Sequence, residues 1–320
     1  MPAVFSESWG KTAGRWWEPR CSIPRRCTSV DKLRLGIPKG SLEKATIDLF
    51  RRAGWHIKVN GRSYFPDIDD PEIACTMCRA QEMSRYVENG TLDCGLTGKD
   101  WIMENDSQVM VVADLMYSKA STRPVRWVLA VPADSDIRSL KDLAGKKIAT
   151  ELVNYTRRYF ESRNIPVSVE FSWGATEAKV AQGLADAVVE VTETGSTIKA
   201  HGLKIIHEFF QSNTQLIVNP QVWENDPFKR EKIENLRVLL LGALRAENMV
   251  GLKMNIPEKS LKAIIALLPS LLAPTISSLY ETDWYSVEVV VNQEEVRNLV
   301  PRLVAAGAQG IVEYPLYKVI

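Results

Sequence analysis

Residues 185–203 constrain the fold of this chain most strongly, because they predict a buried strand that turns directly into a helix. Val188, Val189 and Val191 are typical of the strand. The turn that follows consists of small residues whose backbone N–H groups are free for a ligand: Thr194, Gly195, Ser196 and Thr197. With a helix dipole behind it, such a turn suits a bound phosphate, although an ordinary strand-to-helix turn of an α/β fold has the same shape.

Two acidic residues, Glu190 and Glu193, flank this turn. Carboxylates do not favour a phosphate, but their acceptor oxygens suit ribose hydroxyls or a bound Mg²⁺. The stretch therefore predicts a site for a phosphorylated sugar.

From Asp31 onward the chain alternates predicted strands with helices, as an open α/β fold does. A strand through Ile37 is followed by a turn and by a helix that Gly54 ends. Such sheets bind ligands at the carboxyl ends of their strands, so Lys39 is a candidate for a phosphate, although a solvated loop lysine is commoner. A strand over 125–132 begins a second lobe, and the layout resembles two-lobed folds that close over a ligand.

Residues 246–320 predict the β-α-β-β-α-β order of a ferredoxin-like module. Asn292 and Glu295 predict a capping box at the start of its second helix, which Gly307 ends. Many unrelated functions share this architecture, so the order alone assigns none.

Composition excludes several classes of protein. The 320 residues are 45% hydrophobic and 25% charged, which is typical of a globular, core-forming chain. Forty basic residues against 39 acidic ones leave a formal net charge of +1, so no global field draws the chain to nucleic acid or an anionic membrane. No run approaches the roughly 18 consecutive apolar residues of a membrane span. We expect a soluble protein that binds neither nucleic acid nor a membrane.

The five cysteines show no paired spacing typical of a disulfide framework, which favours a reducing compartment. Cys75 and Cys78 form a C-x-x-C that a redox pair or half a zinc site would also contain. Because no second C-x-x-C follows and the chain holds only three histidines, a packing role is favoured.

Residues 1–30 differ from the rest, with four arginines, only two acidic residues and no apolar run of signal-peptide length. We expect a poorly ordered extension. An organellar transit peptide and a start assigned too far upstream are the alternatives.

Several motifs in one order give the chain a specific resemblance to a known family. They lie at 35–42, 62–66, 79–83, 95–101, 117–131, 185–203, 273–276 and 313–320. On these residues the chain, from about 32 to 320, resembles the ATP phosphoribosyltransferases in their long, feedback-regulated form. The resemblance implies a two-lobed α/β catalytic region like that of periplasmic binding proteins, followed by an ACT-like regulatory domain. The expected parts are lobe I over 31–120 with 206–245, lobe II over 121–205, and the regulatory domain over 246–320.

The family catalyses the first step of histidine biosynthesis, in which N1 of ATP displaces pyrophosphate from phosphoribosyl pyrophosphate in the presence of Mg²⁺. By resemblance, one backbone segment takes the 5′-phosphate: Glu193, Thr194, Gly195, Ser196 and Thr197. Glu190 is expected to accept from ribose hydroxyls. Lys39 and Arg62 are expected at the pyrophosphate, with Arg79 and Lys99 as weaker candidates for the ATP phosphates. Metal-ligating residues stay unassigned, and catalysis would rest on positioning and electrostatics.

The resemblance also implies feedback inhibition by histidine bound to the C-terminal module at Asn255, Thr275 and Gly310. The alternative is that these three residues merely shape turns. A homo-oligomer, dimeric or hexameric, and a cytoplasmic location are expected for this family.

Two other classes remain as alternatives. A two-lobed solute-binding protein would carry an export signal and no phosphate turn, and an amino-acid-sensing regulator would explain only the C-terminal quarter of the chain.

Overall fold

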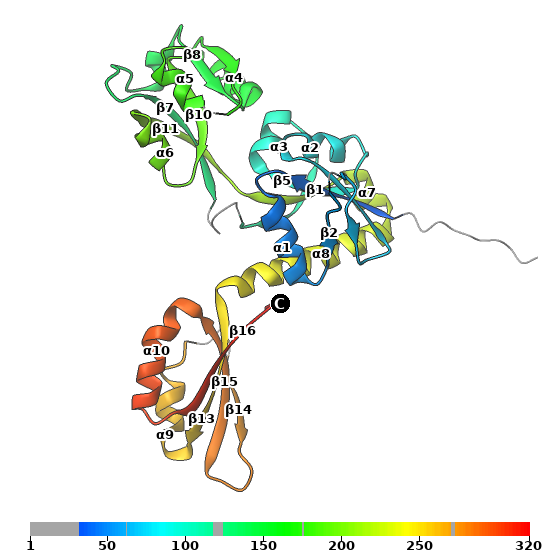
Figure 1. Ribbon diagram of the computed structural model, residues 1–320, viewed down its shortest axis with the longest axis vertical. Helices are drawn as coiled ribbons and strands as arrows, with labels where there is room; N and C mark the ends of the chain where they lie inside the picture. Colours follow the sequence, from blue (N-terminus) through cyan, green and yellow to red (C-terminus); the bar gives the residue numbers. More distant parts are fainter. Residues whose placement is uncertain (1–31, 62, 118–123, 175, 270–272) are drawn as a thin grey trace, which may run out of the picture. The chain divides into compact units, whose positions relative to one another are not determined.

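The described chain forms two five-stranded mixed sheets and one four-stranded antiparallel sheet in this computed structural model (Figure 1). The structure describes residues 32–61, 63–117, 124–174, 176–269 and 273–320. The expected extension at residues 1–30 lies outside them. The element order confirms the predicted α/β fold class with a C-terminal β-α-β-β-α-β domain.

The first sheet combines parallel and antiparallel strands. In spatial order it contains β4 (Ile73–Arg79), β1 (Leu33–Lys39), β5 (Cys94–Gly98), β12 (Thr214–Val218) and β6 (Met110–Leu115). β4, β1 and β5 run parallel, whereas β12 is antiparallel to both of its neighbours. The short strands β2 (Ile57–Lys58) and β3 (Asp67–Ile68) pair with each other before β4.

Five helices belong to this part: α1 (Glu43–Ala53), α2 (Ala80–Glu88), α3 (Lys99–Asn105), α7 (Pro220–Asn225) and α8 (Pro227–Arg245). In β1, Leu35 and Ile37 are fully buried and belong to one core with Phe50 of α1 and Leu240 of α8. α1 ends, as predicted, at Gly54, whose φ of 113° suits glycine. No helix of the described chain has the length and apolar character needed to cross a membrane.

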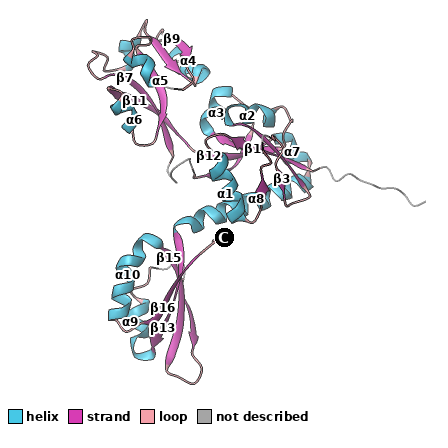
Figure 2. Cartoon of the chain, viewed as in Figure 1, coloured by secondary structure: helices cyan, strands magenta, loops and turns pink. Residues whose placement is uncertain are grey.

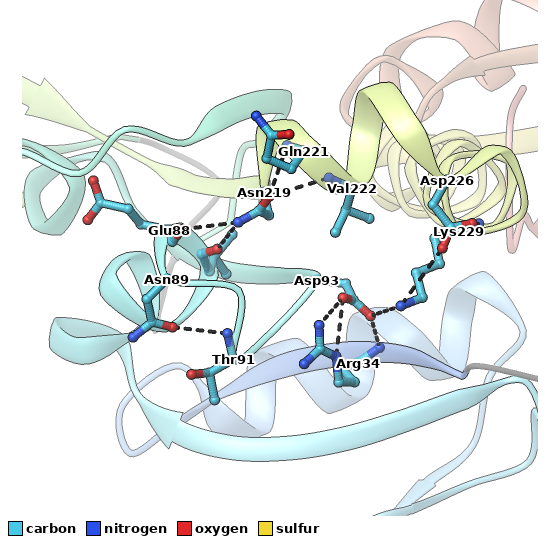
Figure 3. A network of polar contacts seen from close by, with 11 residues as sticks. Arg34, Glu88, Asn89, Thr91, Asp93, Asn219, Gln221, Val222, Asp226 and Lys229 are labelled. Carbon is cyan, nitrogen blue, oxygen red and sulfur yellow. Dashed lines mark hydrogen bonds and ion pairs between the residues drawn. The ribbon is translucent and has the colours of Figure 1, made fainter.

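A buried carboxylate ties three elements of the first part together (Figure 3). Asp93, whose side chain is fully buried, accepts hydrogen bonds from the backbone N–H of Arg34, at 2.8 Å, and from the Arg34 guanidinium. Its other contact is the Nζ of Lys229 on α8, at 3.1 Å. Burial alone would raise the pKa of Asp93, but these cationic partners outweigh it and lower the pKa. Nearby, Asn219 begins α7 and donates to two carbonyls at the end of α2.

The second sheet has the spatial order β11 (Leu203–Ser212), β7 (Val125–Pro132), β10 (Ala187–Thr192), β8 (Lys147–Thr150) and β9 (Ser168–Phe171). Its helical elements are η1 (Leu140–Leu143), α4 (Val153–Glu161), α5 (Thr176–Ala181) and α6 (Ser196–Ala200). β7 has its predicted bounds. Trp127, Leu129 and Val131 of β7 point into the core that also contains Phe160 of α4.

The chain returns to the first sheet later than expected. We predicted that residues from 206 onward belong to lobe I, but β11 pairs with β7 as far as Ser212. β12 then pairs with β5 and β6 from Thr214 onward. The crossing therefore falls at Asn213, while the expected crossing near 120 lies outside the described residues.

The C-terminal sheet has the spatial order β14 (Thr275–Ser278), β15 (Trp284–Asn292), β13 (Met249–Pro257) and β16 (Gln309–Pro315). It follows α8 through η2 (Ala246–Asn248). Figure 2 shows α9 (Glu258–Ile265) and α10 (Gln293–Ala305) on one side of this sheet. Leu252, Met254, Val287, Leu299 and Leu303 form the core between them.

The predicted capping box at Asn292 is wrong in its bonding, although Asn292 is the N-cap of α10. The described Asn292 side chain makes no hydrogen bond to the backbone of the first turn. Its amide instead donates to the Glu295 carboxylate, with Nδ2 and Oε1 3.4 Å apart. α10 ends before Gly307, as predicted.

The last residues of the chain contact the first part of the fold. Lys318 donates through Nζ to the carbonyl oxygens of Arg52 and Ala53 at the end of α1, at 3.3 and 3.2 Å. The N–H of Val319 donates to the Gly242 carbonyl in α8, at 3.0 Å. A side chain at Gly242 would lie 2.9 Å from Ile320, so glycine is needed for this close approach.

Candidate active site

Strand ends and turns of both larger sheets line a cavity of about 750 Å³. From the first sheet, Lys39 at the end of β1, Arg79 at the end of β4 and Asp100 at the start of α3 line it. From the second sheet come Glu151 after β8 and the turn between β10 and α6. The carboxyl ends of strands therefore form the site, as expected for open α/β sheets.

The 194–197 turn is held in shape by its own hydroxyl groups. Gly195 has φ 78° and ψ 5°, and its N–H donates to the Thr192 hydroxyl at 2.8 Å. The hydroxyls of Thr194 and Ser196 lie 2.9 Å apart. The prediction of a free N–H at Gly195 is therefore wrong, and so is the emphasis on a helix dipole, because α6 has only five residues. Thr194, Ser196 and Thr197 line the cavity with Glu193.

Glu190 lies apart from Glu193. Among the described residues that line the cavity, Glu193 is present and Glu190 is not. Burial, followed by the repulsion of Glu177 and Glu151, raises the pKa of Glu190 to about 7, and the Val191 N–H that donates to it opposes the rise. The Glu190 carboxyl group thus takes up a proton near neutral pH.

We expect this proton to make folding stability depend on pH. The folded-state pKa of Glu190 is raised, so the protonated form stabilises the fold, and this contribution is lost as pH rises from 4.5 towards about 7. Glu190→Gln mimics the protonated group and should be more stable than the wild type at pH 8, by on the order of 2 kcal/mol, but not at pH 4.5. Urea unfolding of both proteins at the two pH values measures this. An equal difference at both pH values contradicts the assignment.

Lys39 and Arg79 each lie against an aromatic ring. Lys39 Nζ is 3.9 Å from the ring centroid of Tyr64, and the Arg79 guanidinium is 5.2 Å from that of Trp173. The structure therefore brings these two predicted cations to the same cavity as the 194–197 turn. Arg62, the other predicted cation of this group, lies outside the described residues.

Among the described residues, Lys99 does not line the cavity. It begins α3, where its N–H donates to the Asn213 carbonyl at 3.0 Å. Its charge acts instead on Asp114: hydrogen bonds from Asn213 and Gln215 lower the pKa of Asp114, and Lys99 adds to that effect. The expectation that Lys99 binds ATP phosphates is therefore not supported by its position.

Asp100 is a site residue that the sequence did not single out. Its carboxylate accepts from the Trp127 indole N–H at 2.9 Å, and its own N–H donates to the Ser212 hydroxyl at 3.2 Å. Burial raises the pKa of Asp100, against the effect of the hydrogen bond from Trp127. Trp127 belongs to β7, the first strand of the second sheet, and Ser212 ends β11, its last strand, so Asp100 links α3 to both strands. No local pattern marked Asp100, because its two partners, Trp127 and Ser212, lie 27 and 112 positions away along the chain.

The two cysteines of the C-x-x-C lie on β4 and are buried. Burial, with a smaller contribution from Asp70, raises the pKa of Cys75 to about 12, and burial with Glu82 does the same for Cys78. Both thiols are thus protonated at neutral pH, which disfavours thiolate chemistry. Among the described side chains, no group of three or more His, Cys, Asp or Glu residues gathers to hold a metal ion.

The three residues predicted for histidine binding share the face of the C-terminal sheet opposite α9 and α10. Asn255 of β13 pairs with Ser286, and Thr275 of β14 pairs with Glu288; Asn255 and Glu288 alternate with buried core positions of their own strands. Gly310 has φ 57°, and a side chain there would lie 3.3 Å from the Asn255 amide nitrogen. The structure thus brings Asn255 and Gly310 together, with Thr275 two strands away.

Fold and cavity together define a two-lobed α/β protein with a cavity lined by both lobes and a C-terminal four-stranded antiparallel domain. The profile of the ATP phosphoribosyltransferase family matches residues 79–241, and the profile described as "HisG, C-terminal domain" matches 246–318. The chain belongs to the ATP phosphoribosyltransferase family.

Known relatives cover nearly the same span. The ATP phosphoribosyltransferase of Solidesulfovibrio magneticus is 67% identical over 288 residues, which are 90% of this chain and 98% of that protein. That of Desulfosudis oleivorans is 65% identical over 288 residues, 90% of this chain and 99% of that one. Among solved structures, the ATP phosphoribosyl transferase (HisG:HisZ) complex from Thermotoga maritima aligns with a TM-score of 0.56 and 30% identity, over 65% of this chain and 98% of that chain.

Proposed function

We propose that this cavity transfers the phosphoribosyl group of phosphoribosyl pyrophosphate to N1 of ATP, the first step of histidine biosynthesis. One observation carries the proposal: Lys39, Arg79 and the 194–197 turn line a single cavity of about 750 Å³. Two polyphosphates must approach each other in this reaction, and cations with backbone donors offset their mutual repulsion. Family membership favours this reaction over the solute-binding alternative.

The residues would act by positioning and by charge. We place the 5′-phosphate at Thr194, Ser196 and Thr197, because these hydroxyl-bearing residues line the cavity. Lys39 lies at the end of β1 and lines the cavity. Its positive charge would stabilise the negative charge that develops on the departing pyrophosphate. By resemblance, Arg62 is also expected to act at the pyrophosphate. Adenine N1 has no proton to lose, so no general base is required.

Glu193, rather than Glu190, is the better candidate for the ribose hydroxyls, because among the described residues Glu193 lines the cavity and Glu190 does not. Mg²⁺ usually binds substrate phosphates together with one or two carboxylates. Glu151 and Glu193 line the cavity and are of the required type. When bound, Mg²⁺ would neutralise part of the polyphosphate charge.

The reaction is tested by mixing the purified full-length protein with ATP, phosphoribosyl pyrophosphate and Mg²⁺. We expect pyrophosphate release only when both substrates are present, together with a new absorbing product, phosphoribosyl-ATP. Release without ATP would indicate hydrolysis, and no release would refute the proposal. We further propose that the enzyme acts in the cytoplasm, where its ATP substrate is made.

Histidine would inhibit from the C-terminal domain, and a homo-oligomer, dimeric or hexameric, would form there. The support is the exposed sheet face that carries Asn255, Thr275 and Gly310. Coupling between two such sites is typically 1–3 kcal/mol, or roughly 5- to 150-fold in affinity.

Asn255→Ala should therefore raise the histidine concentration that gives half-inhibition by about tenfold, because an amide that can hydrogen-bond the ligand is lost. Turnover without histidine should stay unchanged. Ser278→Ala, on the same sheet, is the matched control and should be inhibited like the wild type. If Asn255→Ala and Ser278→Ala respond alike, the histidine site lies elsewhere.

A further inference from the structure

Successive residues of α3 join the lobe built on the first sheet to the lobe built on the second. Asp100 accepts from the Trp127 indole of β7. Trp101 packs against the core of the second sheet, whereas Ile102 packs against a buried cluster of α2 and the first sheet. Because neighbouring side chains of one helix belong to different lobes, α3 is a joint between them.

The carboxylate of Glu104, also on α3, caps a helix of the other lobe. Its two oxygens accept from the backbone N–H groups of Asn154 and Tyr155 in the first turn of α4, at 3.0 and 2.9 Å. The N-cap of α4 is Leu152, which has no polar side chain to do this. Glu104 is only 8% exposed, so little water competes for its two bonds. A negative charge at this end of a helix is also favoured by the helix dipole.

A second polar contact joins the same two helices. The exposed Arg158 of α4 donates through its guanidinium to the carbonyl oxygen of Met103 in α3. Hydrogen bonds are directional, whereas apolar packing is not, so these contacts fix the angle between α3 and α4. α4 begins two residues after Glu151, which lines the active-site cavity. A change of this angle would therefore move the cavity wall.

We propose that Glu104 is a positioning residue for phosphoribosyl transfer, which acts through α4. It holds the second lobe at the angle at which Lys39 and the 194–197 turn line one cavity. This rests on the proposed function, in which the phosphoribosyl substrate spans these two groups. Among the described residues Glu104 does not line that cavity. Without the cap, the second lobe adopts other angles as well, and the productive arrangement is populated less.

Glu104→Ala should lower kcat/KM for ATP and for phosphoribosyl pyrophosphate by the same factor, roughly tenfold, as expected from the loss of a helix cap. Ribose 5-phosphate contacts only the second lobe in the proposed assignment, so its affinity in calorimetric titration should change by less than about twofold. Glu104→Gln keeps one acceptor oxygen and should lose less activity than Glu104→Ala, with both substrates again affected alike.

Glu88→Ala is the matched control. The Glu88 carboxylate also accepts from a backbone N–H, that of Gln108 at 2.7 Å, but both residues belong to the first lobe. This variant should have the wild-type kcat/KM for both substrates.

Three results would overturn the positioning role of Glu104. The first is an unchanged kcat/KM for both substrates in folded Glu104→Ala or, if that variant does not fold, in Glu104→Gln. The second is a loss confined to one substrate, which would make Glu104 a binding residue. The third is an equal loss of ribose 5-phosphate affinity, which would show that the second lobe itself is disturbed. Failure of the proposed function is distinct, because the wild type would then release no pyrophosphate.

Discussion

Replacement of Gly195 by valine should lower phosphoribosyl transfer at least a hundredfold. Gly195 has φ 78°, a left-handed conformation that a β-branched residue adopts only with strain. The neighbouring space is not the obstacle, since a Cβ would lie 3.4 Å from Ile205, an ordinary contact. The backbone would move instead, which would break the bond from Gly195 N–H to Thr192 and displace the phosphate-binding groups. Loss of one such preorganised donor commonly costs roughly 100- to 1000-fold in rate.

Gly202→Val is the matched control for this prediction. Gly202 has φ 70°, and no heavy atom of the described chain lies within 4 Å of the position that a Cβ would take there. Among the described residues neither glycine lines the cavity, but Gly195 lies between two that do, Thr194 and Ser196, whereas the chain neighbours of Gly202 do not. Both variants should lose similar thermal stability, measured by circular dichroism, but only Gly195→Val should lose pyrophosphate release. Comparable activity in the two folded variants would remove the 194–197 turn from the mechanism.

Asp93→Ala should destabilise the fold by about 3–5 kcal/mol, because it removes the carboxylate that faces a buried cation. Lys229 has only 7% of its side chain exposed, and its next acidic partner, Asp226, is 3.9 Å away. The pKa of Asp93 is lowered in the fold, so its contribution is present above the ordinary carboxyl pKa and is lost as pH falls below it. Urea unfolding at pH 7 measures the change.

Asp48→Ala is the control for charge alone. Asp48 pairs with Arg51 at 3.0 Å on an exposed helix face, where such pairs contribute less than about 1 kcal/mol. The Asp93→Ala variant should have the same substrate KM values as the wild-type protein at a temperature where the variant is folded. The reason is that Asp93 does not line the cavity in the described chain. A loss below about 1 kcal/mol in Asp93→Ala would show that Arg34 and Lys229 are readily solvated.

Regular hydrophobic patterns predicted the fold where the strands are regular. The strand over Val125–Pro132 has its expected bounds because it is a continuous apolar run, in which every residue from 127 to 131 is buried. The resemblance placed residues from 206 onward in lobe I, whereas β11 stays paired with β7 to Ser212, with shifts of register between Ile205 and His207 and between Glu208 and Phe210. Each bulge reverses which side chains point inward, so a strict two-residue period cannot follow the strand.

The site was predictable where one segment supplies it, as in the 194–197 turn. It was not predictable where distant segments meet. The bond from Trp127 to Asp100 joins residues 27 positions apart, and the contact of Arg79 with Trp173 has no counterpart in local pattern. Lys99 stays a prediction: its neighbours Gly98 and Asp100 line the cavity, whereas the charge of Lys99 lowers the pKa of Asp114.

The returning C-terminus makes the regulatory domain difficult to delete cleanly. Removal of residues after Arg245 would also remove Lys318 from the carbonyls that end α1, and Ile320 from the surface of α8 beside Gly242. A shortened enzyme would thus lose a helix cap in its catalytic half along with its effector domain. If such a truncated protein were insensitive to histidine, the cause could be the loss of the C-terminal domain or the loss of the cap on α1. Single substitutions on the exposed sheet face leave the cap in place and so test the domain alone.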